Sequence, residues 1–220
     1  MKIKLTQYVL VVSLTFITSS AFATTNYSDE ATFSEALGDA SVTLESFESV
    51  LDKGTETPSL VFATADVSCD GSSWCSNFFG VSPLMPTDGA MGVYFATPDS
   101  ITFTFAAPIT AFSIDVGGLG TKGATDFSAT LSNGTETTFL TGYSGSSFDQ
   151  LFIGVIDDSE FTSITFHGTI PDDGIYFDRM QTALAEIPAP IPEPSTYAML
   201  LTGLLLLGAS AHRKKQKVSI

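Results

Sequence analysis

The sequence predicts a mainly β fold: an antiparallel, jelly-roll-like β-sandwich with one short N-terminal helix, flanked by a signal peptide and a C-terminal transmembrane helix. Three observations favour this class. Apolar and polar residues alternate in several short runs, as in strands with one buried and one solvated face. Gly, Pro, Asn and Asp separate these runs roughly every ten residues, and no amphipathic helices lie between them. A plain sandwich is the alternative to the jelly roll.

The first 23 residues predict a secretory signal peptide. Lys2 and Lys4 give a positive start, residues 8–17 form an apolar centre, and Ala21-Phe22-Ala23 is a small-x-small cleavage site. An uncleaved N-terminal anchor is the alternative. We expect export through the secretion translocon and a β-sandwich domain over residues 24–184.

A short helix is predicted at the start of this domain. Ser28, with acidic residues at 29 and 30, suits a helix N-terminus, where negative charge meets the positive end of the dipole. Phe33 and Leu37 lie four residues apart on one face, and Gly38 is a suitable stop.

The rest of the domain predicts strands. Ala107-Pro108 is expected to turn the chain between two of them, each with one buried and one wet face, and Asn133-Gly134 predicts a hairpin. The long segment 66–89 is rich in Ser, Gly and Pro, so we expect it to lie outside the core. The expected strands are 42–48, 59–66, 91–96, 100–106, 109–116, 127–132, 136–141, 150–156, 161–167 and 174–183.

The C-terminal segment has three parts in a fixed order. Residues 185–194 form a Pro-rich linker, residues 197–211 carry no charge, and a basic tail follows. Fifteen residues make about 22 Å of helix, which just spans a hydrocarbon core of about 30 Å if flanking side chains reach the interface. Positive charge after such a run places that end in the cytoplasm. A permanent tail anchor is the alternative to a removable one.

This segment resembles the PEP-CTERM sorting signal of exported proteins of Gram-negative bacteria. The resemblance spans residues 192–217 and rests on Pro192-Glu193-Pro194, the apolar run and the basic end. It implies an inner-membrane precursor, processing near Pro192, Glu193 and Pro194 by the membrane enzyme exosortase, and delivery to the cell surface or exopolysaccharide matrix. The domain in front resembles β-sandwiches often found before such signals, which are likened to carbohydrate-binding modules.

Charge excludes one class of partner. Outside residues 1–23 and the basic tail, only Lys53, Lys122 and Arg179 are basic against 24 acidic residues, a formal charge of −21. Such a domain repels nucleic-acid phosphates and anionic lipid headgroups. We therefore expect no nucleic-acid binding.

Cys69 and Cys75 are the two cysteines of the chain. In an oxidising compartment a pair this close in sequence predicts a disulfide. A free pair is the alternative, because a metal site would need further ligands and the exported part has one histidine, His167.

No catalytic residues are predicted, and we expect a non-enzymatic protein. The sequence holds no Gly-x-Ser-x-Gly elbow, P-loop or His-Glu-x-x-His motif. His167 lies in a predicted strand without a partner, which favours a structural or surface role. Paired carboxylates cannot be recognised among so many acids, so a hydrolase of unknown class is the least favoured alternative.

Two ligand hypotheses remain. Jelly-roll modules often hold a structural Ca²⁺ between an early and the last strand, and by that resemblance Glu48 and Asp178 match, with Glu45 a weaker candidate. Acids that cap strand ends in solvent are the alternative, and Asp157-Asp158 and residues 172–174 favour turns. Exopolysaccharide binding would use exposed aromatic rings. The available rings are Trp74, Tyr94, Tyr143 and Tyr176.

Overall fold

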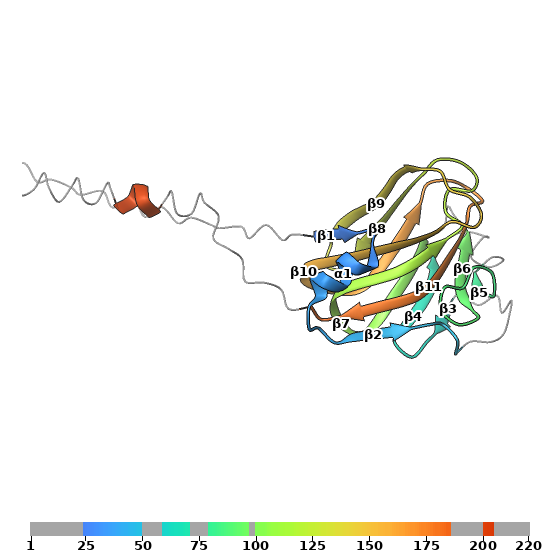
Figure 1. The fold of residues 1–220 in the computed structure, drawn as a ribbon, viewed down its shortest axis with the longest axis horizontal. Helices are drawn as coiled ribbons and strands as arrows, with labels where there is room; N and C mark the ends of the chain where they lie inside the picture. The colour runs from blue at the N-terminus through green and yellow to red at the C-terminus, as the bar shows by residue number, and fades with distance from the viewer. Residues whose placement is uncertain (1–23, 50–58, 71–78, 97–99, 186–199, 205–220) are drawn as a thin grey trace, which may run out of the picture. The chain divides into compact units, whose positions relative to one another are not determined.

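The computed structural model describes residues 24–49, 59–70, 79–96, 100–185 and 200–204 (Figure 1). The compact unit ends at Ala185, and residues 200–204 of the second unit are helical. Among these described residues, none of the helices has the length and hydrophobicity that a membrane span requires. The predicted signal peptide, the linker beyond residue 185 and most of the sorting segment lie outside the described residues.

The compact unit is mainly β and antiparallel, as the sequence predicts. One helix, α1 (Glu30–Leu37), accompanies the strands. The strands are β1 (Thr24–Tyr27), β2 (Val42–Glu45), β3 (Ser59–Val61), β4 (Ala65–Asp70), β5 (Gly80–Ser82), β6 (Gly92–Ala96), β7 (Ser100–Gly117), β8 (Thr125–Leu131), β9 (Glu136–Tyr143), β10 (Gln150–Gly168) and β11 (Gly174–Ala183).

Two long strands, β7 and β10, contribute to both layers of the sandwich. The first half of β7 pairs with β4 and with the second half of β10, giving the strand order β3-β4-β7-β10-β8-β9. The second half of β7 pairs with β11 and the first half of β10, giving the order β5-β6-β11-β7-β10-β1, with β2 beside the end of β11. Each long strand therefore connects the two layers.

The predicted turn at Ala107-Pro108 is wrong. The chain continues as one strand through these residues, and residues 150–168 likewise form one strand where two were expected. The register between β7 and β10 shifts opposite this point, between Ile156 and Phe161. Proline cannot donate a ladder hydrogen bond, and such an irregularity tolerates it. Pro108 thus marks a bend from one layer to the other.

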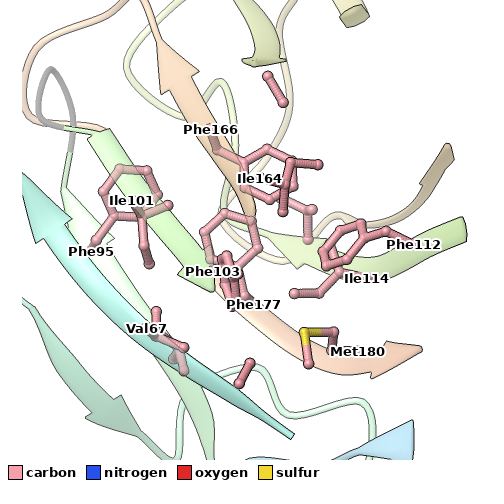
Figure 2. Packing of buried hydrophobic residues seen from close by; sticks show 14 of the residues in the cluster. Val67, Phe95, Ile101, Phe103, Phe112, Ile114, Ile164, Phe166, Phe177 and Met180 are labelled. Carbon is pink, nitrogen blue, oxygen red and sulfur yellow. The ribbon is translucent and has the colours of Figure 1, made fainter. Parts of the chain in front are cut away.

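A phenylalanine-rich core fills the space between the layers (Figure 2). Phe103 and Phe166 from one layer meet Phe177 of β11 from the other, with ring centroids 5.5 and 5.3 Å from Phe177. All three side chains are fully buried. Rings at these separations add specific contacts to the burial of apolar area, so they hold the two layers together.

The second half of β7 is buried on both faces, where one wet face was expected. Ala111 packs with Phe33 and Leu37 of α1, which lies over the outer face. A Cβ on Gly154 would lie 2.8 Å from the Phe33 ring, so the absence of a side chain at this glycine leaves space for the ring. The helix itself is confirmed: Asp29 is its N-cap and accepts a bond from Thr32 N, while Gly38 ends it.

Segment 66–89 contributes to the core, contrary to expectation. The expected strand 59–66 is a hairpin of β3 and β4, and β4 continues to Asp70 against β7. Val67 and Phe79 are buried, as is Val81 in β5. The prediction relied on average composition and overlooked the alternation of Ala65, Val67 and Cys69 with polar residues.

Polar residues form two of the described turns. The Asn133-Gly134 hairpin between β8 and β9 is confirmed, with Gly134 at φ +92° and Leu131 N donating to Thr135 O at 2.8 Å. The turn at Asp172 is also present. Asp157, in contrast, lies inside β10 and is fully buried, so the turn expected there is wrong.

Candidate binding pocket

A pocket of about 260 Å³ lies where β7 ends and β10 and β11 begin. It is built from loop residues and strand ends rather than from a sheet face. Its lining is largely apolar, with a few hydroxyl and backbone groups. The lining residues are Leu84, Met85, Gly118, Thr121, Ser147, Phe148, Gly174 and Tyr176.

Two of the aromatic residues proposed for sugar binding contact each other beside this pocket, and one of them, Tyr176, lines it. Tyr94 of β6 and Tyr176 of β11 are register partners, and their rings lie 4.7 Å apart at 35°. Glycines make room for them: a Cβ on Gly174 would lie 2.9 Å from the Tyr94 ring, and one on Gly118 would lie 3.1 Å from the Tyr176 ring. Burial raises the pKa of both phenols, so both remain protonated donors at neutral pH.

The loop that carries Leu84 and Met85 is fastened by two carboxylates. Asp178 Oδ2 accepts the N–H groups of Thr87 at 2.6 Å and Asp88 at 2.8 Å. Glu48 Oε1 accepts the next donors along the loop, Ala90 N at 2.6 Å and Met91 N at 2.8 Å. These bonds hold one wall of the pocket against the end of the sandwich.

These carboxylates are the residues for which Ca²⁺ was predicted. They hold the same loop, but Asp178 Oδ1 also faces a backbone donor, Arg179 N at 2.7 Å. Burial raises the pKa of Asp178, against the effect of these bonds. Glu45 lies apart and accepts from Phe47 N and from Thr64. Within the described ranges no group of three or more His, Cys, Asp or Glu side chains is placed to hold a metal ion, and a structural Ca²⁺ stays a prediction.

Two further acids fix the other loops around the pocket. Asp173 accepts Gly120 N at 2.6 Å and the Thr121 hydroxyl at 2.6 Å, which shapes the turn after β7. Asp149 accepts both the N–H and the hydroxyl of Ser146, and these bonds lower its pKa. The loop that presents Phe148 is therefore closed by its own hydrogen bonds.

The remaining sequence-predicted residues fall elsewhere. Tyr143 ends β9, and its hydroxyl donates to Asp149 at 3.3 Å, so it supports the Phe148 loop without lining the pocket. His167 lies exposed on β10 with Nε2 3.2 Å from the Thr130 hydroxyl, as expected for a surface histidine. Cys69 lies in β4 opposite Ile101 of β7, whereas Cys75 and Trp74 lie outside the described residues, so the disulfide stays a prediction.

Sequence reasoning missed Phe148 and the Leu84-Met85 pair. Phe148 is 86% exposed and Leu84 is 60% exposed, both beside the pocket. A signal was available for Phe148: a large aromatic residue in the otherwise small and polar loop Ser144–Asp149 has no strand alternation to bury it. An apolar wall of this kind, with neutral hydroxyls at its edge, can stack on a flat ring and orient it by hydrogen bonds.

Fold and pocket together define an antiparallel β-sandwich protein with an aromatic-lined pocket at one end of its strands. The more particular identification comes from the tail. Residues 190–214 match the PEP-CTERM protein-sorting motif, which confirms the resemblance seen in the sequence. The match covers the sorting segment and leaves the sandwich unassigned.

The chain also has weak structural likenesses. It is similar to a variant of CBM29-2, a family 29 carbohydrate-binding module, at 12% identity and TM-score 0.42, covering 69% of this chain and 99% of that one. For a second variant, complexed with mannohexaose, the identity is 12% and the TM-score 0.40, covering 66% of this chain and 93% of that one. For the catalytic domain of a GH87 alpha-1,3-glucanase, the identity is 15% and the TM-score 0.39, covering 70% of this chain and 30% of that one. With TM-scores this low, the likenesses carry no ligand or activity to this chain. No curated protein matches.

Proposed function

We propose that this chain is an exported, non-enzymatic surface or extracellular-matrix protein that exosortase sorts through its C-terminal segment. The observation that carries the proposal is the PEP-CTERM match over residues 190–214. The acidic exported part agrees with it, because a formal charge of −21 keeps a secreted domain soluble. In this account the precursor is held in the inner membrane until its tail is removed.

Substitution of the motif tests the sorting step. Changing Pro192, Glu193 and Pro194 to alanine is expected to abolish processing, because the enzyme no longer meets its recognition residues. Fractionation of cells and medium should then show full-length protein in the inner membrane and none outside. Pro188→Ala, just before the matched segment, is the matched control and should leave delivery unchanged. Normal export of the triple variant would contradict the proposal.

A second function, polysaccharide binding, is favoured by the pocket itself. Tyr94 and Tyr176 form a tilted pair beside it, and Phe148 projects from its rim. The strongly negative charge of the domain favours a neutral or cationic polymer over a polyuronic one. The candidate ligand is therefore a neutral exopolysaccharide at the surface to which the protein is delivered.

Phe148→Ala is expected to weaken this binding about tenfold, the loss of roughly 1.4 kcal/mol of stacking. The side chain is 86% exposed, so the fold should be unaffected. Binding is measured by a glycan array followed by calorimetry with the best neutral glycan. Val61→Ala, an exposed apolar residue of β3 that does not line the pocket, should bind normally. Equal affinity of both variants, or an array without signal, would reject the sugar site.

A further inference from the structure

Asp157 is a buried carboxylate whose bonding partners are all neutral. Its exposed fraction is 0%. Oδ2 accepts the Thr24 hydroxyl at 2.5 Å, and Oδ1 accepts Asn133 Nδ2 at 3.1 Å and Ser159 N at 2.8 Å. Arg179, the basic residue of β11, binds other acids, Glu30 and Asp115. A carboxylate buried in this way is costly without a positive partner.

The start of β1 lies directly beside this carboxylate. Thr24 is the first residue of that strand and the register partner of Asp157. The nitrogen and the hydroxyl oxygen of one threonine are three bonds apart, so the Thr24 nitrogen lies within about 6 Å of Asp157 Oδ2. In the sequence, Ala21-Phe22-Ala23 immediately precedes this residue. Cleavage after Ala23 would convert a neutral amide nitrogen into an α-ammonium group at this place.

We propose that signal-peptide cleavage completes the fold, because the new α-ammonium of Thr24 becomes the counter-charge of Asp157. Water hydrolyses the Ala23–Thr24 peptide bond: its oxygen goes to the Ala23 carbonyl carbon, and the Thr24 nitrogen leaves and is protonated. The inference rests on the export part of the proposed function. Its consequence is a domain that is more stable after release from the membrane than as a precursor.

The contact joins three parts of the sandwich, so its strength matters beyond β1. Asn133 belongs to the turn between β8 and β9 and also donates to Ser159 O at 3.2 Å. The ion pair would therefore fasten the first strand and this turn to β10. The other ionisable side chains of β1 and of residues 150–160 of β10 are Tyr27, Asp158 and Glu160, which are all acidic groups, and Glu136 at the start of β9 is acidic as well. The one basic side chain of β10 is His167, at the opposite end of the strand, where Nε2 lies 3.2 Å from the Thr130 hydroxyl. None of them can replace the ammonium group.

A cycle of four proteins tests the pairing. Residues 24–220 are prepared in mild detergent with Thr24 as the first residue or behind a Gly-Ser extension, each with Asp157 or with Asp157→Asn. The extension is expected to raise the unfolding equilibrium constant about tenfold or more, the strength of a charge-assisted hydrogen bond. It should have no effect in the Asp157→Asn background. Asp158→Asn, an exposed neighbour, is the matched control and should retain the full effect.

If Asp157→Asn does not fold, the pairing of the Thr24 α-ammonium with Asp157 is tested by measuring the stability of the extended and unextended proteins over a range of pH. A free α-amine has a pKa of about 7.7–8.0, and pairing with a carboxylate raises it in the folded state. The extra stability of the protein that starts at Thr24, relative to the extended protein, should thus be complete below about pH 7.7. It should disappear as the pH rises past the raised pKa of the α-amine. Hydrogen exchange of residues 25–27 reports the same change locally.

Two results would overturn the proposal. One is equal stability of the extended and unextended proteins at neutral pH. The other is an exported protein whose first residue, by N-terminal sequencing, is not Thr24. In the second case the protein has still been exported, so sorting by the C-terminal segment stands independently.

Discussion

Replacing Arg179 with alanine is expected to lower the free energy of unfolding by about 3 kcal/mol, the low end of the cost of removing one partner from a buried ion pair, because Asp115 is buried but Arg179 itself is partly exposed. The guanidinium donates to both oxygens of Asp115, from Nε at 2.8 Å and from Nη2 at 3.0 Å. Nη1 reaches Glu30 of α1 at 2.6 Å. The Asp115 side chain is only 9% exposed, so the alanine variant leaves its charge buried without a cation.

Urea denaturation measures this loss, and Lys122→Ala is the control. That variant also removes one positive charge, but from an exposed side chain, and is expected to change stability by less than about 0.5 kcal/mol. The difference in unfolding free energy between the unsubstituted protein and Arg179→Ala should become smaller at acidic pH. The hydrogen bond from Arg179 lowers the pKa of Glu30 below its ordinary value of 4.5. The stability that this pairing adds is therefore fully present above pH 4.5 and is lost as the pH falls through the lowered pKa of Glu30. Equal midpoints for the two variants would show that the network is not stabilising.

Phe166→Ala is expected to cost a similar amount, about 3–5 kcal/mol, through the cavity it leaves between the layers. Phe166 is fully buried, and its ring lies 5.3 to 6.0 Å from the rings of five other phenylalanines. These neighbours come from β7, β8, β9 and β11, so the space cannot close without moving several strands.

The midpoint of urea denaturation should fall while its slope stays constant, since the exposed area on unfolding hardly changes. Phe148→Ala is the matched control, because it removes the same side chain from an 86% exposed position. A small loss for Phe166→Ala, no greater than that of the control, would mean that the core is not packed around this ring.

The strand content of the fold follows from local pattern, and here prediction succeeded. Ile101 and Phe103 alternate with threonines, and Asn133-Gly134 favours the positive φ that a tight hairpin needs. The connection of strands was harder. Whether Pro108 marks a turn or a bend depends on the strand that pairs with it, and β10 is more than forty residues away in the sequence.

The site was only partly predictable, because it too depends on pairing between strands that are distant in the sequence. Tyr94 and Tyr176 were singled out as aromatic residues, but their contact depends on the pairing of β6 with β11. Arg179 was overlooked, although an arginine inside a strand of so acidic a domain has few alternatives to pairing with acids. Its partners come from α1 and β7, 149 and 64 residues away, and no local pattern indicates them.

Sorting by exosortase is tested most directly by the intact mass of the protein recovered from the cell surface or medium. A sorted protein should have lost the apolar run and the basic tail, and should therefore end near residues 192–194. Recovery of an exported form that still contains residues 197–217 would contradict it, since the C-terminal segment would then be a lasting anchor and not a sorting signal.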